Sequence, residues 1–247
     1  MAGIRKLLAL AEPRGSVDAL ERVLGTAGSD VDAVAIVGDL AEVWSKPETY
    51  RAIFKTLGES GHAAFWVPGP NDAPLREYLS ESHNLEIVFP RLRGVHGTLA
   101  LSATHVLFAG MGGEIKDAPD TIRGEEYLIR YPGWEAEYRL KALADVDAHA
   151  SVLLFATPPA HKGLGLPGSD VLAELVKTHR PAVVVAGGEE PREGLLGRTI
   201  FVAPGRLDHG HYAVVDLRAR SVEAGRVEVP APGLEPKPVA EEEHARR

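Results

Sequence analysis

The chain has 247 residues, of which 45% are hydrophobic and 25% are charged, and its formal net charge is −8. That is enough apolar material for one large domain, and the acidic balance argues against general binding to nucleic acid or to an anionic membrane. The chain has no cysteine, which excludes disulfides and thiolate chemistry and is consistent with the cytoplasmic location that we expect.

The first third of the chain alternates apolar runs of strand length with helical patterns. The run 7–11 is too short for a signal sequence or a membrane span, so we expect a strand there. Further strands are expected at 34–38 and 63–67, because continuous apolar runs suit strands that are covered on both faces. Ser16 is expected to cap one intervening helix and Pro47 to begin another.

The rest of the chain predicts a mixed α/β domain with a partly antiparallel half. A shorter helix is expected after residue 72, followed by strand-like pieces from 85 to 110 at hairpin spacing. Helices are expected over 134–146 and 170–178, and strands at 106–110, 152–156, 182–187, 199–203 and 212–217. The domain should cover 1–229. Residues 230–247 are rich in proline and glutamate, with almost no large apolar groups, and are expected to form a disordered tail.

Most of the expected strands end in loops that carry glycine or proline together with polar groups. These are AEPRGS (11–16), VGDLAE (37–42), VPGPND (67–72), FATPPAHKG (155–163) and AGGEEP (186–191). Their order and spacing resemble the calcineurin-like metallophosphoesterases, whose motifs are D-x-H, G-D-x-x-D, G-N-H-D/E, a lone His before prolines, and G-H-x-H. The resemblance implies an α/β four-layer sandwich, in which two packed mixed β-sheets are flanked by helices.

The same resemblance implies a site where carboxylates, an asparagine and histidines hold two metals that activate a hydroxide. In this chain the first aspartate of the family is Glu12, and the histidine that follows it is Arg14. The aspartate of the second motif is kept as Asp39.

In the third motif, the family's asparagine falls on Pro70 and its histidine on Asn71, while Asp72 matches the trailing acid. Because proline has no side-chain donor or acceptor, this motif loses a ligand. The remaining family histidines fall on Ala156, Gly188 and Glu190. The resemblance therefore implies a degenerate dinuclear site.

Two functional hypotheses follow. In the first, the protein is non-catalytic or weakly active and binds a small phosphate-bearing or other anionic ligand, or a partner, in the old cleft. Arg14 would then neutralise nearby carboxylates or help to bind the anion beside the helix N-terminus at Ser16. The candidate cleft residues are Glu12, Arg14, Asp39, Asn71, Asp72, Glu114, His161, Glu189 and Glu190.

In the second hypothesis the protein is an active phosphoesterase with an altered, single-metal site. Its oxygen ligands would favour one Mg, Mn or Ca ion over zinc. These ligands would be Glu12, Asp39, Asn71 and Glu190. A third class, an interaction protein without a ligand site, would be supported if Trp134 and Tyr138 were exposed in an apolar patch.

The tail gives a first prediction. Deleting residues 230–247 should leave the melting temperature of the protein nearly unchanged, because these residues bury too little apolar surface to offset the entropy lost on ordering. Thermal unfolding of the full-length and shortened chains would check this, and a large drop would show that the tail packs against the domain.

Overall fold

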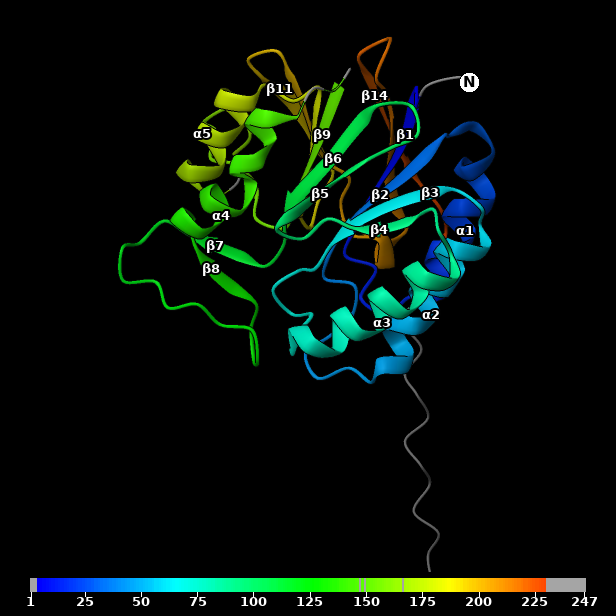
Figure 1. The fold of residues 1–247 in the computed structure, drawn as a ribbon. Coiled ribbons are helices and arrows are strands. Elements are labelled where there is room, and N and C mark those ends of the chain that lie inside the picture. The colour runs from blue at the N-terminus through cyan, green and yellow to red at the C-terminus, as the bar shows by residue number, and fades with distance from the viewer. Residues whose placement is uncertain (1–3, 147, 149, 166, 230–247) are drawn as a thin grey trace, which may run out of the picture.

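The computed structural model describes residues 4–146, 148, 150–165 and 167–229, and the predicted tail lies outside this part of the chain. Two six-stranded sheets pack against each other, and helices cover their outer faces (Figure 1). The first sheet has the order β14 (Ser221–Arg226), β13 (His211–Asp216), β1 (Lys6–Ala11), β2 (Ala33–Val37), β3 (Ala63–Val67) and β4 (Leu92–Gly94). The second has the order β11 (Arg192–Leu196), β12 (Thr199–Ala203), β10 (Val183–Ala186), β9 (Ala150–Phe155), β6 (Val106–Met111) and β5 (Thr98–Leu101).

Five α-helices and a small sheet complete the described part of the domain. The helices are α1 (Val17–Ala27), α2 (Pro47–Glu59), α3 (Leu75–Val88), α4 (Gly133–Leu140) and α5 (Asp170–His179). Short 3-10 turns lie at Gly28–Asp30, Lys141–Asp145 and Leu207–His209, and β7 (Glu114–Lys116) pairs with β8 (Arg130–Pro132). Figure 1 shows α1, α2 and α3 beside the first sheet and α4 and α5 beside the second. The predicted four-layer α/β sandwich is confirmed.

Each sheet has a block of four parallel strands with antiparallel strands beside it. The chain runs β1, β2, β3 and β4 in parallel, and likewise β6, β9, β10 and β12. Antiparallel pairs add β13 and β14 to the first sheet, and β5 and β11 to the second. The expected antiparallel component is therefore confirmed, and the carboxyl ends of the parallel strands of each sheet lie along one edge.

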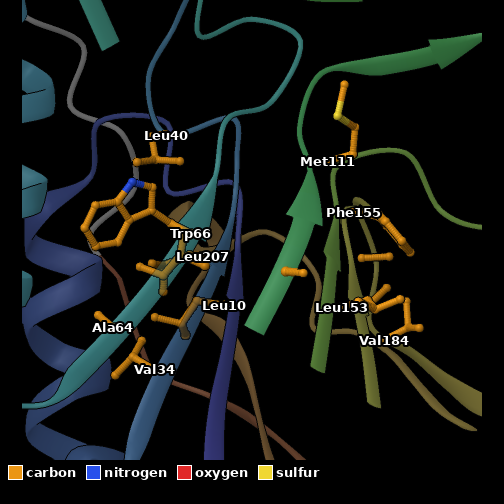
Figure 2. Packing of buried hydrophobic residues seen from close by; sticks show 14 of the residues in the cluster. Leu10, Val34, Leu40, Ala64, Trp66, Met111, Leu153, Phe155, Val184 and Leu207 are labelled. Atoms are coloured by element: carbon orange, nitrogen blue, oxygen red, sulfur yellow. The ribbon is translucent and has the colours of Figure 1, made fainter. Parts of the chain in front are cut away.

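The continuous apolar runs are explained by burial on both faces of each strand. In β1, Leu8 and Leu10 belong to the core under the helices, whereas Leu7 and Ala9 belong to the core between the sheets. Figure 2 shows members of the first group on both sheets, including Trp66 and Leu153. Between the sheets, Phe65 stacks on Phe108 with ring centroids 3.6 Å apart.

Local signals place the helix starts where the sequence predicts them. The hydroxyl of Ser16 accepts a hydrogen bond from the amide of Ala19, and Pro47 occupies the first turn of α2. Ser169 caps α5 in the same way through the amide of Leu172. Such caps satisfy backbone donors that a helix leaves free at its N-terminus.

The predictions between residues 72 and 146 need correction. The helix after residue 72 is the 14-residue α3, so the prediction of a strand-like piece at 85–88 was wrong. Leu85 packs against the core while Ile87 and Val88 are exposed, so the apolar content there reflects the end of a helix. The helix expected over 134–146 is α4 and then a 3-10 turn. The short strands β7 and β8, and the outer strands β11 and β14, were not predicted.

The predicted aromatic pair on α4 is exposed. Trp134 is 64% and Tyr138 is 62% accessible, and the ammonium of Lys141 lies 4.2 Å from the centre of the Tyr138 ring. Within the described ranges, every helix is too short or too polar to cross a bilayer.

A part-buried polar network links the loop before β5 to the end of β6 and to β8. The amide of Gly112 donates to Nδ1 of His96 at 3.0 Å, and Nε2 of His96 lies 3.0 Å from the hydroxyl of Tyr131. That hydroxyl donates to Glu125 at 2.6 Å. With Nδ1 accepting, the neutral His96 carries its proton on Nε2. Burial, together with the charges of nearby arginines, lowers the pKa of His96 to about 3.

This histidine predicts a pH dependence of stability. The unfolded chain takes up a proton at His96 as the pH falls through its ordinary pKa of about 6.5, whereas the folded chain does not until about 3. The stabilising contribution is thus complete above pH 6.5 and is lost, at about 1.4 kcal/mol per pH unit, as the pH falls toward 3. His96→Gln should flatten this slope by about one proton. Denaturant unfolding at several pH values, with exposed His83→Gln as control, would measure the change, and an unaltered slope would contradict it.

Candidate functional site

A cleft of about 480 Å³ lies where loops from the carboxyl ends of strands in both sheets converge. Glu12 follows β1, Asp39 follows β2 and Asn71 follows β3, while Ala156 follows β9 and Glu189 follows β10. This edge is where open α/β sheets bind ligands. The full lining is Glu12, Arg14, Gly38, Asp39, Pro70, Asn71, Ala156, Pro158, Pro167, Gly187, Gly188, Glu189, Glu190 and Arg192.

Two glycines allow the loops after β2 and β3 to touch. A Cβ on Gly38 would lie 2.1 Å from the amide nitrogen of Gly69, and a Cβ on Gly69 would lie 2.1 Å from Oδ1 of Asp39. No side chain fits in either place, because real contacts of this kind are far longer. The glycines of VGD and VPG therefore do more than turn the chain, since they bring Asp39 against the neighbouring loop.

The side chain of Asp72 joins the loops after β2 and β3 through hydrogen bonds. Its fully buried carboxylate accepts hydrogen bonds from the amides of Leu40 at 2.9 Å, Ala41 at 2.8 Å and Gly69 at 2.7 Å. Burial and the nearby charge of Asp39 raise the pKa of Asp72 to about 7, against the opposing effect of the three amides. Asp72 does not line the cleft, although the sequence placed it among the candidates.

Asp39 is paired with Asn71 at the floor of the cleft. The amide nitrogen of Asn71 donates to Oδ1 of Asp39 at 2.8 Å, and its side-chain Nδ2 donates to Oδ2 at 2.7 Å. Burial raises the pKa of Asp39, and the hydrogen bonds from Asn71 and the charge of Arg14 partly offset this. Each carboxylate oxygen already has one donor from the chain itself.

Glu12 and Arg14 form an ion pair in the same cleft. Nη2 of Arg14 lies 2.8 Å from Oε2 of Glu12, and the side chains are 23% and 12% exposed. Burial raises the pKa of Glu12, with Arg14 acting in the opposite direction. Both residues have positive φ, of 49° and 45°, a conformation that non-glycine residues seldom adopt. The sequence suggested Asp39 or Glu12 as the partner of Arg14, and the structure places the hydrogen bond on Glu12.

Main-chain hydrogen bonds hold this strained turn. The amide of Glu12 donates to Val37, that of Arg14 to Asp39, and that of Gly15 to Leu40. Nε of Arg14 is buried without a hydrogen-bond partner, while its Nη1 lies 4.0 Å from Glu42. The guanidinium thus keeps donor capacity beyond its bond to Glu12.

Two further arginines belong to the surroundings of the cleft and were missed from the sequence. Arg192 lines it directly from the start of β11. Arg206 follows β12, pairs with Asp208, and adds its charge to the electrostatics of Glu12. The signal that could have found them is their position, because each follows a glycine-containing loop after an apolar run. Arg192 follows GGEEP, and Arg206 follows VAPG.

The remaining candidates divide into two groups. Glu189 and Glu190 line the cleft as exposed side chains. Glu114 lies away from it on β7, where burial would raise its pKa but Lys116 and Arg130 lower it overall. His161 also lies outside this cleft and accepts a hydrogen bond from the amide of Gly163. In the described part of the chain, no three His, Asp or Glu side chains form a group that could hold a metal.

A family model described as "Metallophosphoesterase, calcineurin superfamily" matches residues 43–227. The chain belongs to this family. The metallophosphoesterase assignment agrees with the loop order predicted from the sequence, and with the position of the cleft at the strand ends.

Solved structures share this fold. TT1561 of Thermus thermophilus is 42% identical, with a TM-score of 0.86, and the match covers 91% of this chain and 100% of that one. A second solved structure is 26% identical, with a TM-score of 0.81 and coverage of 90% and 99%. Phosphopantetheinyl hydrolase (PptH) from Mycobacterium tuberculosis shares the fold at 14% identity, with a TM-score of 0.54 and coverage of 94% and 100%. Comparison with curated proteins gave no match.

The Glu12–Arg14 pair predicts a coupling that a double-mutant cycle can measure. Arg14→Ala should destabilise the protein by on the order of 2 kcal/mol, because it leaves a largely buried carboxylate unpaired. Adding Glu12→Gln should recover much of the loss, whereas Arg14→Lys should preserve only part of the stability.

The measurement is denaturant unfolding with chelator present throughout. The exposed pair Lys55 and Glu59 on α2 serves as a matched control and should show almost no coupling. Additive effects of the two cleft substitutions would contradict the prediction.

Proposed function

We propose that this metallophosphoesterase-family protein binds a small anionic ligand in its cleft, without the two-metal hydrolysis that the family fold implies. The observation that carries the proposal is the ion pair between Arg14 and Glu12, at 2.8 Å. A permanent cation stands where the family resemblance expects a neutral metal-binding histidine, and it repels a divalent ion at that place.

The donors around the cleft support the same conclusion. Pro70, Ala156 and Gly188 occupy family ligand positions and offer no side-chain oxygen or nitrogen. Asp39 already accepts two hydrogen bonds from Asn71. This donor set does not fit a dinuclear metal site, and we derive no catalytic step through one.

The positive groups indicate the kind of ligand. Arg14 and Arg192 both line the cleft, and guanidinium groups bind phosphate and carboxylate through paired hydrogen bonds. Glu189 and Glu190 lie on the same lining and disfavour a bulky polyanion. The ligand is therefore a small molecule whose single phosphate or carboxylate reaches Arg14.

An active single-metal phosphoesterase is the second candidate, because one observation favours it. All four proposed ligands line the same cleft, and they are Glu12, Asp39, Asn71 and Glu190. Asn71 now directs its amide nitrogen at Asp39, so its side-chain amide would have to rotate to present oxygen to a cation. A bound ion would also have to displace Arg14 from Glu12.

The two candidates differ in metal content and hydrolysis. Protein purified without chelator should hold less than stoichiometric transition metal by elemental analysis. Hydrolysis of an aryl phosphate ester should stay near the uncatalysed rate, and Asp39→Ala should hardly change it. Two stoichiometric metals, or a metal-stimulated rate that Asp39→Ala abolishes, would establish the enzyme instead.

Anion binding tests the first candidate directly. With chelator present, inorganic phosphate should bind, and Arg14→Gln should weaken its affinity by roughly tenfold, since a charged hydrogen bond is lost. Calorimetric titration would measure both affinities, with the exposed Arg22→Gln on α1 as the charge-matched control. Equal weakening by both substitutions would contradict a site at Arg14.

A further inference from the structure

A second and larger hollow, of about 830 Å³, lies between α5 and the turn that joins β11 to β12. We call it the basic groove. It is lined by Ala150, Ser151, Ala160, His161, Ala173, Glu174, Val176, Lys177, Arg180, Pro181, Ala182, Leu196, Gly197, Arg198, Thr199 and Arg220. Its volume is within the range of small-molecule sites.

The basic groove is separate from the family cleft. It is lined by Ala150, the first residue of β9, by Ala182, just before β10, and by Thr199, the first residue of β12. The cleft instead contains Ala156 and Gly187, which follow the last residues of β9 and β10. The strand positions that line the two sites are therefore at opposite ends of the same parallel strands, and the sites share no lining residue.

Charge distinguishes the basic groove from the rest of this acidic chain. Lys177 and Arg180 come from the C-terminal end of α5, whereas Arg198 and Arg220 come from two hairpin turns. Glu174 is the one acid of the lining, and its carboxylate oxygens lie 3.1 and 3.2 Å from Nζ of Lys177. In a protein of net charge −8, three arginines thus meet around one hollow with no acid assigned to them.

The arginines approach one another without neutralising partners. Nη2 of Arg220 donates to the carbonyl oxygen of Arg198, which holds two like-charged residues side by side. Among the described residues, no acid forms an ion pair with Arg180, Arg198 or Arg220. The partial negative charge at the C-terminus of α5 gives a structural reason for Lys177 and Arg180. It does not explain the arginines on the two hairpin turns.

The groove also offers apolar contacts. Ala173 and Val176 face it from α5, Leu196 from β11, and Pro181 from the loop before β10. A ligand with an apolar body and a multiply charged head matches both features, since guanidinium groups bind phosphate oxygens in pairs. The acidity of the whole chain disfavours a long nucleic acid, which would contact much more of its surface.

We propose that the basic groove binds a small organic molecule that carries two or more linked phosphates. The phosphates contact Arg180, Arg198 and Arg220, and the organic part lies on the apolar residues of α5 and β11. This site does not depend on the function proposed for the cleft.

The test uses the full-length protein, with ATP and inorganic tripolyphosphate as probes and chelator present. Calorimetric titration should show saturable binding of ATP, with weaker binding of tripolyphosphate because it lacks the organic part. The double variant Arg180→Gln/Arg198→Gln should weaken ATP binding by roughly tenfold or more, since two charged contacts are lost. Neither side chain has an ion pair in the described structure, so both substitutions should leave the melting temperature near wild type.

Two control variants show whether ATP binds in the groove itself. Arg218→Gln removes one charge from the same turn as Arg220 without touching the groove lining, and it should change the affinity less than about twofold. Arg14→Gln reports on the cleft and should leave ATP binding unchanged. Loss of ATP binding in Arg14→Gln would assign the probe to the cleft and overturn the proposal.

Three other results would also overturn it. The first is equal weakening by Arg218→Gln, which indicates non-specific charge attraction. The second is no measurable binding of either phosphate probe. The third is tighter binding of a hexaglutamate peptide than of ATP. Failure of the cleft to bind inorganic phosphate would leave the groove proposal intact, because the two are tested with different variants.

Discussion

The architecture of the cleft depends on the close approach of two loops, those after β2 and β3. Gly38 and Gly69 permit the approach because neither has a Cβ, and Asp72 holds it with three main-chain hydrogen bonds. A buried carboxylate is stable in such a place only if amides satisfy it. Once the loops are fixed in this way, Asp39 and Asn71 must face each other, and the position of the cleft floor follows.

The charges above that floor are arranged in pairs within the chain. Asp39 is satisfied by Asn71, and Glu12 by Arg14, so neither buried carboxyl is left without a partner. Loss of one partner from a buried pair costs more than the pair itself contributes. The family fold associates this cleft with metals, whose positive charge balances the carboxylates. Here Arg14 supplies positive charge, so the carboxylates of the cleft are stable beside it.

The sequence predicted most of the strands and the overall architecture, because both depend on local signals. Runs such as VAIVG and AVVVAG are apolar throughout, and the glycine and proline turns after them mark the strand ends. The prediction ended α3 too early, because Ile87 and Val88 give a strand-like pattern on an exposed helix end. It also missed β14, whose residues are mostly exposed and whose pairing with β13 depends on tertiary contacts.

The candidate site was predictable in part, because the residues that directly follow strands can be identified from the sequence. Residues directly after strands, such as Glu12, Asp39 and Asn71, reach the cleft as expected, because the order of parallel strands brings their ends together. Glu114 and His161 come from longer excursions whose direction the sequence does not indicate, and both lie elsewhere. The partner of Arg14 depends on a turn with positive φ at two residues, which no propensity indicates.

The placement of charge at the two ends of the second sheet gives the molecule an electrical polarity along its strands. β9 has six residues and is therefore about 20 Å long, more than twice the screening length of about 8 Å at physiological salt. Each end thus presents its own local field, because the cleft combines two arginines with several acidic side chains, whereas the groove carries three arginines and Lys177 with one acid. A small anion that approaches this acidic protein therefore responds to the end it meets rather than to the net charge, so the two sites can select anions of different charge.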